Sequence, residues 1–260
     1  MNKWNAVILA GDRGSSDPVA NAANVNGKAL VKFNGVTQIE RIVKVLHDSQ
    51  CVNELYALGP SLDCLNDCEE VSSMYKHYGV NYLPPNKGPS SSALLGVKKS
   101  HHFPTLVITS DLPLLTTDAI ENYCKEVIKQ DVDFVVGAVN YESINALLPE
   151  LKKTRYQFSD SEVCFANVFA VLTPLGMKAI EYWQDIEQSR KNPLAVIRKI
   201  DWWSVLQYKL GCISVSQASL KLSRKLGANL NIEMFAVPEL AIDVDSAHDY
   251  RVLKKFLEDK

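Results

Sequence analysis

Short apolar runs alternate with segments of helical period along most of the chain. The first run, Ala6-Val-Ile-Leu-Ala10, predicts a buried strand that ends at Gly11. Later runs predict further strands at residues 53–58, 80–83, 105–109, 133–139, 163–171 and 230–237. Between them, apolar positions at helical spacing predict helices at residues 37–46, 61–70, 116–130 and 173–189. Strands that alternate with helices favour a parallel sheet with right-handed crossovers.

A polar loop of small residues follows the first predicted strand. It runs from Gly11 to Gly27, and Lys28 closes it before the next apolar stretch. Such a loop can present free backbone N–H groups to an anion, and glycine lets a phosphate come close because it has no Cβ. An ordinary surface loop is the alternative that the residues leave open. Two familiar phosphate loops are excluded: Ala29 stands where a P-loop needs Ser or Thr, and Gly14 does not give the G-x-G-x-x-G spacing.

Two later segments carry polar residues where a predicted strand ends. Asp111 follows the strand at 105–109, at the edge where α/β sheets bind ligands. A helix N-cap is its alternative role, although Thr116 or Thr117 fits that role better. Residues 85–93, Pro-Asn-Lys-Gly-Pro-Ser-Ser-Ser-Ala, offer a second polar surface ahead of a helix, and an ordinary helix cap is the simpler explanation for them.

Composition and charge narrow the class of protein. The 260 residues are 47% hydrophobic and 22% charged, enough for one α/β domain with a full core. A net charge of −2 gives no electrostatic case for a nucleic-acid partner. No apolar run approaches the roughly 18 residues that span a bilayer, and the N-terminus leads into a strand instead of a secretory signal. Six scattered cysteines suit reduced thiols, so we expect a cytoplasmic protein without a transmembrane segment.

Several short motifs occur in a characteristic order along the chain. They are Leu9-Ala-Gly11, Gly14, Lys28-Ala-Leu30, Asn34-Gly35, Asp111-Leu-Pro113, Asn167-Val-Phe169 and Asp243-Val-Asp245. This order resembles the MobA-like nucleotidyltransferase family, which includes molybdenum-cofactor and sugar-phosphate nucleotidyltransferases. The resemblance implies a three-layer α/β/α, Rossmann-like fold with a mixed, mostly parallel sheet of the nucleotide-diphospho-sugar transferase type. It also implies a single domain over residues 1–260, in which residues 140–237 form an acceptor-side or lid subregion.

The same resemblance assigns roles to individual residues. Lys28, with Arg13, would stabilise the charge that develops at the α-phosphate of a nucleoside triphosphate (NTP). Asp111 and Asp245 would bind a catalytic Mg²⁺, with Asp243 as the second choice for the C-terminal ligand. The nucleotide would be bound by Leu9, Ala10, Gly11, Gly14, Lys87, Gly88, Pro89, Ser90 and Ser91.

The chain departs from the family pattern in the first loop. Asp12 replaces the second glycine of the usual L-A-G-G, and Ser15 and Ser16 stand where an arginine is usual. The loop to Lys28 is also longer than usual. Because a carboxylate beside a triphosphate is repelled, Asp12 must point away, bind a cation or weaken the chemistry.

The function implied is transfer of a nucleoside monophosphate (NMP) from an NTP to a phosphorylated or hydroxyl acceptor, with release of pyrophosphate. A non-catalytic nucleotide-binding protein on the same fold is one alternative, which Asp12 keeps open. A glycosyltransferase that uses a nucleotide-sugar is another, although Asp111-Leu-Pro113 lacks the second carboxylate of the usual D-x-D. The partners expected are therefore an NTP, Mg²⁺ and a small-molecule acceptor.

Residues 191–227 carry the least familiar pattern. Apolar residues alternate there with basic ones, which predicts two or three packed helices that form a lid or acceptor wall. The adjacent Trp202 and Trp203 with basic neighbours also suit a homodimer or membrane-surface patch.

Overall fold

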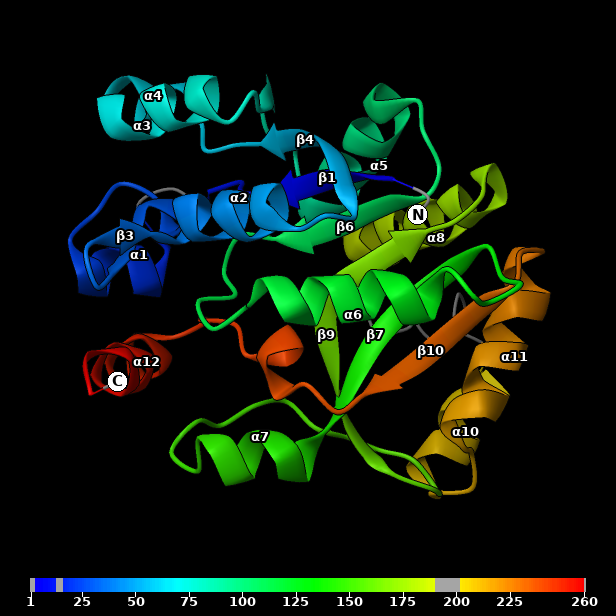
Figure 1. The fold of residues 1–260 in the computed structure, drawn as a ribbon. Helices are drawn as coiled ribbons and strands as arrows, with labels where there is room; N and C mark the ends of the chain where they lie inside the picture. The colour runs from blue at the N-terminus through cyan, green and yellow to red at the C-terminus, as the bar shows by residue number, and fades with distance from the viewer. Residues whose placement is uncertain (1–2, 13–15, 190–201, 260) are drawn as a thin grey trace.

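A central mixed sheet organises the computed structural model, which describes residues 3–12, 16–189 and 202–259. Its strands are β1 (Trp4–Leu9), β4 (Val52–Leu58), β5 (Asn81–Leu83), β6 (Thr105–Thr109), β7 (Phe134–Asn140), β8 (Tyr156–Gln157), β9 (Glu162–Val171) and β10 (Leu230–Phe235). The order across the sheet is β10-β7-β9-β6-β1-β4-β5, and β8 pairs with β9 (Figure 1). Every pair is parallel except those that β9 makes with β6, β7 and β8. The prediction of a mixed, mostly parallel sheet is confirmed.

Helices cover both faces of this sheet. They are α1 (Pro18–Ala23), α2 (Gln38–Asp48), α3 (Leu62–Asn66), α4 (Glu69–His77), α5 (Pro89–Ser100), α6 (Thr117–Val127), α7 (Tyr141–Leu147), α8 (Met177–Ser189), α10 (Trp202–Lys209), α11 (Val215–Leu226) and α12 (Ala247–Glu258). Figure 1 shows α2 and α6 across one face, while α5 and α8 pack on the other. The three-layer α/β/α architecture is therefore confirmed. None of the described helices is long and apolar enough to cross a membrane.

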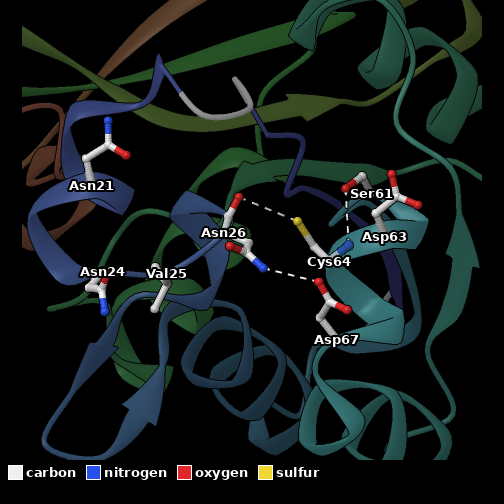
Figure 2. A pocket seen from close by; sticks show the side chains of 8 residues that line it. All are labelled: Asn21, Asn24, Val25, Asn26, Ser61, Asp63, Cys64 and Asp67. Atoms are coloured by element: carbon white, nitrogen blue, oxygen red, sulfur yellow. Dashed lines mark hydrogen bonds between the residues drawn. The ribbon is translucent and has the colours of Figure 1, made fainter.

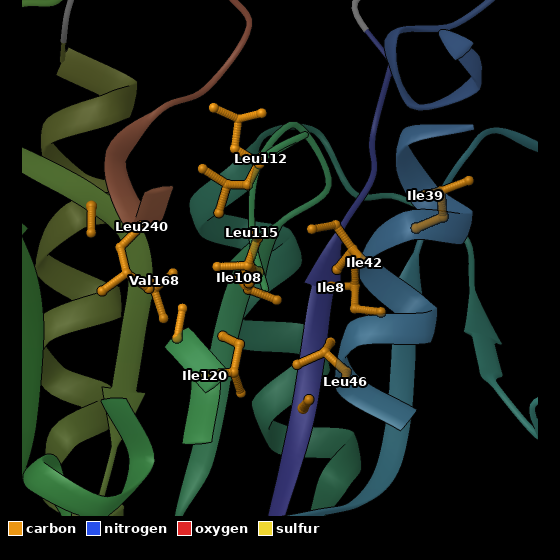
Figure 3. Close-up of a cluster of buried hydrophobic side chains, with 14 of the residues drawn as sticks. Ile8, Ile39, Ile42, Leu46, Ile108, Leu112, Leu115, Ile120, Val168 and Leu240 are labelled. Carbon is orange, nitrogen blue, oxygen red and sulfur yellow. The ribbon is translucent and has the colours of Figure 1, made fainter. Parts of the chain in front are cut away.

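Strand β1 shows why both layers form. Ile8 points into the cluster with Ile42 of α2 and Ile120 of α6 (Figure 3), whereas Val7 points to α5 and α8. Burial of each such side chain contributes about 1.5–3 kcal/mol to stability. On α5, a Cβ at Gly96 would lie 2.4 Å from Val7 Cγ1, so this helix packs closer to the strand than a larger residue allows.

Local capping sets the ends of the elements near the site. Thr116 Oγ1 accepts a hydrogen bond from the Ala119 amide and caps the start of α6. The prediction that Thr116, and not Asp111, fills the capping role is therefore confirmed. The helix predicted at residues 61–70 is instead two helices, α3 and α4. Asp67 ends α3, and the acidic first turn of α4 favours a new helix start there, because carboxylates are stabilised at helix N-termini.

The strand predicted at residues 230–237 is shorter in the structure than expected. Strand β10 ends at Phe235, and a 3₁₀ turn, η4 (Pro238–Ala241), follows because proline cannot donate to a ladder. The chain then crosses to the carboxyl end of β6, where the Val244 amide donates to the Asp111 carbonyl over 3.1 Å.

The segment at 191–227 is described only in part. Residues 190–201 lie outside the described residues, and α10 and α11 make up most of the rest. Helix α11 packs against β10 and contacts α8 (Figure 1). Leu210, which directly follows α10, is 66% exposed, and Leu220 on α11 is 52% exposed.

Candidate active site

Three carboxylates meet at the carboxyl edge of the sheet. Asp111 follows β6, and Asp243 and Asp245 follow η4. One carboxylate oxygen of each residue lies within 4.8 Å of the other two, which is close enough for the three to bind one metal ion. The expectation that Asp111 and Asp245 converge is confirmed. Asp111 follows strand β6, whereas Asp245 reaches the same edge because the Val244 amide bonds to the Asp111 carbonyl.

Lys28 lies between two of these carboxylates. It opens a 3₁₀ turn, η2 (Lys28–Leu30), and Gln38 Nε2 donates to its carbonyl over 2.8 Å. Lys28 Nζ is 2.5 Å from Asp111 Oδ2 and 3.0 Å from Asp245 Oδ1. Burial lowers the pKa of the Lys28 ammonium, but the two negative charges outweigh it and hold the pKa above its usual value. For Asp245 the two effects have the opposite signs. Burial raises the pKa of its carboxyl, but the charge of Lys28 outweighs burial and holds that pKa below its usual value.

A second cation holds Asp243. Lys153 Nζ forms an ion pair with the Asp243 carboxylate, and Asn167 Nδ2 donates to Asp243 Oδ2 over 2.7 Å. Burial, followed by the charge of Asp111, raises the pKa of Asp243 to about 6. Lys153 was not predicted, because it lies in a loop between α7 and β8 that carries no motif or periodicity.

A cavity of about 760 Å³ extends from these charged groups. Of the predicted site residues, those that line it are Leu9, Gly11, Lys28, Lys87, Gly88, Pro89, Asp111, Asp243 and Asp245. Ala10 is buried beneath it, and Ser90 and Ser91 bond within the protein. Arg13 and Gly14 lie outside the described residues. Residues that the sequence did not predict also contribute to the lining, among them Asn86, Trp183 and Glu187.

The first backbone amides of α5 donate hydrogen bonds to side chains of the protein. Ser91 Oγ accepts a hydrogen bond from the Gly88 amide over 3.0 Å, which satisfies the amide at the N-cap of the helix. Glu187 of α8 accepts from the Ser90 amide over 3.1 Å and from the Ser90 hydroxyl. A Cβ at Gly88 would lie 2.1 Å from Glu187 Oε1, so the glycine makes room for the carboxylate.

Asp12 has a structural partner that the sequence did not reveal. Its Oδ2 accepts a hydrogen bond from the Ser61 amide over 2.9 Å, and a Cβ at Gly27 would lie 2.2 Å from its Oδ1. Oδ1 is buried without a partner among the described residues, and burial raises the pKa of this carboxyl. Asp12 therefore ties the first loop to the start of α3, at the edge of the cavity.

The end of the same loop is anchored on α3 as well. Figure 2 shows Asn26 opposite Cys64 and Asp67 of α3, with hydrogen bonds from Asn26 Nδ2 to Asp67 Oδ2 over 3.2 Å and from Cys64 Sγ to the Asn26 carbonyl over 3.6 Å. A polar pocket of about 440 Å³ lies between these groups and α1. These contacts fix the chain just ahead of Lys28 and so help to set the position of its ammonium group.

Comparison with known proteins identifies the family. The MobA-like NTP transferase domain matches residues 6–197, so the chain belongs to this family. Family membership makes it a nucleotidyltransferase, an enzyme that transfers an NMP from an NTP, as the motif order predicted. No curated protein matches the sequence.

Solved structures share the fold over nearly the whole chain. A hypothetical transferase from Thermus thermophilus is 23% identical, with a TM-score of 0.78 over 95% of this chain and 99% of that one. A nucleotidyl transferase from Methanothermobacter thermautotroptrophicus is 15% identical, with a TM-score of 0.58 over 100% and 99%. The CTP:phosphocholine cytidylyltransferase from Streptococcus pneumoniae is 16% identical, with a TM-score of 0.58 over 98% and 99%. At such low identity these likenesses show the fold.

Proposed function

We propose that this nucleotidyltransferase uses Mg²⁺ to transfer an NMP from an NTP to a small acceptor that bears a phosphate or hydroxyl group, with release of pyrophosphate. The observation that carries the proposal is the Lys28 ammonium held between the carboxylates of Asp111 and Asp245 at one end of the cavity. A cation beside a cluster of carboxylates suits a polyphosphate that arrives with a divalent metal.

The residues fit a magnesium ion. Asp111, Asp243 and Asp245 offer oxygen ligands, which this hard cation prefers, and their oxygens lie within 4.8 Å of one another. Three carboxylates face two ammonium groups, those of Lys28 and Lys153, so the charges in the cluster leave a net negative charge for a cation. Bound Mg²⁺ would neutralise charge on the triphosphate and orient it.

The residues of the chain would position the reaction. An acceptor oxygen attacks the α-phosphorus, the bond to the oxygen that bridges to the β-phosphate breaks, and pyrophosphate leaves with the electron pair. The backbone amides from Gly11 onward would hold the β- and γ-phosphates, and Lys28 would stabilise the charge that develops at the α-phosphate. Asn167 would help to hold the carboxylate cluster in place, because its amide donates to Asp243.

Pyrophosphate release tests this function. The purified chain is incubated with each NTP, Mg²⁺ and a panel of small phosphate monoesters and alcohols, while native mass spectrometry identifies any co-purified ligand. We expect one combination of NTP and acceptor to release pyrophosphate. The Lys28→Ala variant should lose this release. The Lys32→Ala variant, which removes an exposed lysine paired with Glu70, should keep it. NTP binding without pyrophosphate from any acceptor would favour a binding protein, and NDP release from a nucleotide-sugar would favour a glycosyltransferase.

Two further expectations belong to this proposal. All six cysteines are free thiols, which fits a reducing cytoplasm where NTPs are available.

The exposed Leu210 and Leu220 favour a homodimer contact through α10 and α11. Light scattering of the native chain and of a Leu210→Glu/Leu220→Glu variant tests it, because a dimer built on these helices should become a monomer in the variant.

A further inference from the structure

Helix α8 presents an aromatic ring and a carboxylate to the same cavity as the charged cluster. Trp183 and Glu187 both line it and lie four positions apart, which places them on one face of the helix. The Trp183 ring packs against Phe169 of β9, with ring centroids 5.8 Å apart. The cavity therefore has an aromatic wall in addition to its charged end.

Strand β9 joins this wall to the carboxylates. Asn167 and Phe169 are two positions apart on β9, so their side chains lie on one face of the sheet, roughly 7 Å apart along the strand. Asn167 bonds to Asp243, whereas Phe169 contacts Trp183. A ligand with its phosphates near Lys28 would therefore extend its other end along β9 toward α8.

The Glu187 carboxylate is fixed by hydrogen bonds and forms no ion pair within the part of the chain that the structure describes. Oε2 accepts two hydrogen bonds from Ser90, which orients the group and leaves Oε1 beside Gly88. Among the described residues, no lysine or arginine forms an ion pair with Glu187. A carboxylate only accepts hydrogen bonds, so it repels phosphates and carbonyl oxygens and attracts N–H donors.

We infer that Trp183 and Glu187 recognise the nucleobase: the base stacks on the Trp183 ring, and the Glu187 carboxylate accepts a hydrogen bond from an exocyclic amino group. This inference rests on the proposed function and names the specificity of the same site. The cavity then selects a base with an amino group over its analogue with a carbonyl or a hydrogen in that place. Aromatic stacking supplies affinity for any base, and the carboxylate supplies the discrimination.

Matched nucleotide pairs test the inference by calorimetry. CTP is compared with UTP, and GTP and ATP with ITP, because the members of each pair differ in an amino group. We expect the tightest NTP to carry the amino group and to bind at least about tenfold tighter than its analogue, since a hydrogen bond to a charged group is worth at least that factor. Inorganic tripolyphosphate, which lacks a base, reports binding at the Lys28 end alone.

Variants of α8 separate recognition from a structural role. Glu187→Gln keeps an oxygen for Ser90 but presents an amide N–H₂, so the preference within the pair should fall at least fivefold while tripolyphosphate binding stays unchanged. Trp183→Leu should weaken both members of the pair about tenfold and also leave tripolyphosphate unchanged. Glu181→Gln, at an exposed carboxylate on the same helix, is the matched control and should bind every ligand as the native chain does.

Two kinds of result overturn the inference. Equal binding within each pair, a preference for UTP or ITP, or an equal loss of NTP and tripolyphosphate in Glu187→Gln would show that Glu187 only supports α5. A native chain that binds neither the NTPs nor tripolyphosphate with Mg²⁺ would overturn the proposed function and this inference with it. Tripolyphosphate binding together with equal binding within each pair would overturn the inference alone.

Discussion

Lys28 Nζ lies 3.0 Å from Asp245 Oδ1, although 217 positions separate the two residues in the chain. The first loop brings the lysine to the carboxyl edge of the sheet, and the crossing after η4 brings the carboxylate. The ammonium lies against Asp111 as well, so one cation joins the beginning, the middle and the end of the fold. Without a metal ion, Lys28 therefore stabilises the fold as well as belonging to the proposed active site.

We predict that Lys28→Ala lowers transfer at least about 100-fold, since removal of a positioned group that stabilises transition-state charge costs this much in other enzymes. In EDTA the variant should also unfold at a lower temperature than the native chain, because the carboxylates lose a counter-charge. Excess Mg²⁺ should narrow that gap. Lys32→Ala serves as the control, and equal turnover of Lys28→Ala and Lys32→Ala would remove Lys28 from the site.

The fold could be predicted from the sequence because its signals are local. Apolar runs mark the buried strands, and residues 105–109 coincide with β6. The place of Asp111 followed from one general property, that α/β sheets bind ligands at the carboxyl ends of their strands. Asp245 was placed by its motif alone, because it follows the 3₁₀ turn η4 and not a strand. Asp249 caps helix α12, since its Oδ2 accepts hydrogen bonds from the Asp245 and Ser246 amides.

The missed site residues depend on packing between distant segments. Lys153 and Asp243 are 90 positions apart, and Ser90 and Glu187 are 97 apart, so neither pair leaves a pattern in the sequence. Trp183 and Glu187 lie in a helix whose apolar spacing explains its burial but not which residues face a cavity. The partner of Asp12 is also distant in sequence, since Ser61 begins a different helix.

We predict that Lys153→Met lowers the free energy of unfolding by about 3–5 kcal/mol at pH 8, because the buried Asp243 carboxylate loses its partner. The side chains of Lys153 and Asp243 are only 8% and 17% exposed, so water replaces little of the lost interaction. A Lys153→Met/Asp243→Asn double variant should recover most of the loss. Denaturant titration of the native chain, both single variants and the double variant gives the coupling energy, and strictly additive losses would contradict a stabilising pair.

The raised pKa of Asp243 predicts a pH dependence of stability. With a folded-state pKa of about 6 and an ordinary value of 3.8, the folded chain keeps a proton between about pH 4 and 6 that the unfolded chain has lost. The free energy of unfolding therefore falls as pH rises through this window. Asp243→Asn cannot titrate, so in EDTA its melting temperature should rise relative to the native chain from pH 4 to pH 7. A difference that is constant with pH would contradict the shift.

The last prediction concerns Asp12, whose charge and hydrogen bond can be separated. Asp12→Ala would remove both the negative charge and the acceptor for the Ser61 amide, whereas Asp12→Asn removes the charge and keeps an oxygen for that amide. We expect Asp12→Ala to lose about 1 kcal/mol of unfolding free energy through the missing hydrogen bond, and Asp12→Asn to lose less. Differential scanning calorimetry measures both.

For the nucleotide, the charge at the edge of the cavity should raise the cost of binding a triphosphate. Asp12→Asn should therefore bind NTP up to about tenfold tighter than the native chain, and the gain should be largest when Mg²⁺ is scarce, because Mg²⁺ and solvent screen the repulsion. Titration of NTP at low and high Mg²⁺ measures the effect. If Asp12 instead helps to bind the cation, the variant should lose Mg²⁺-dependent binding. Weaker binding at every Mg²⁺ concentration would show that the carboxylate serves the loop and does not repel the nucleotide.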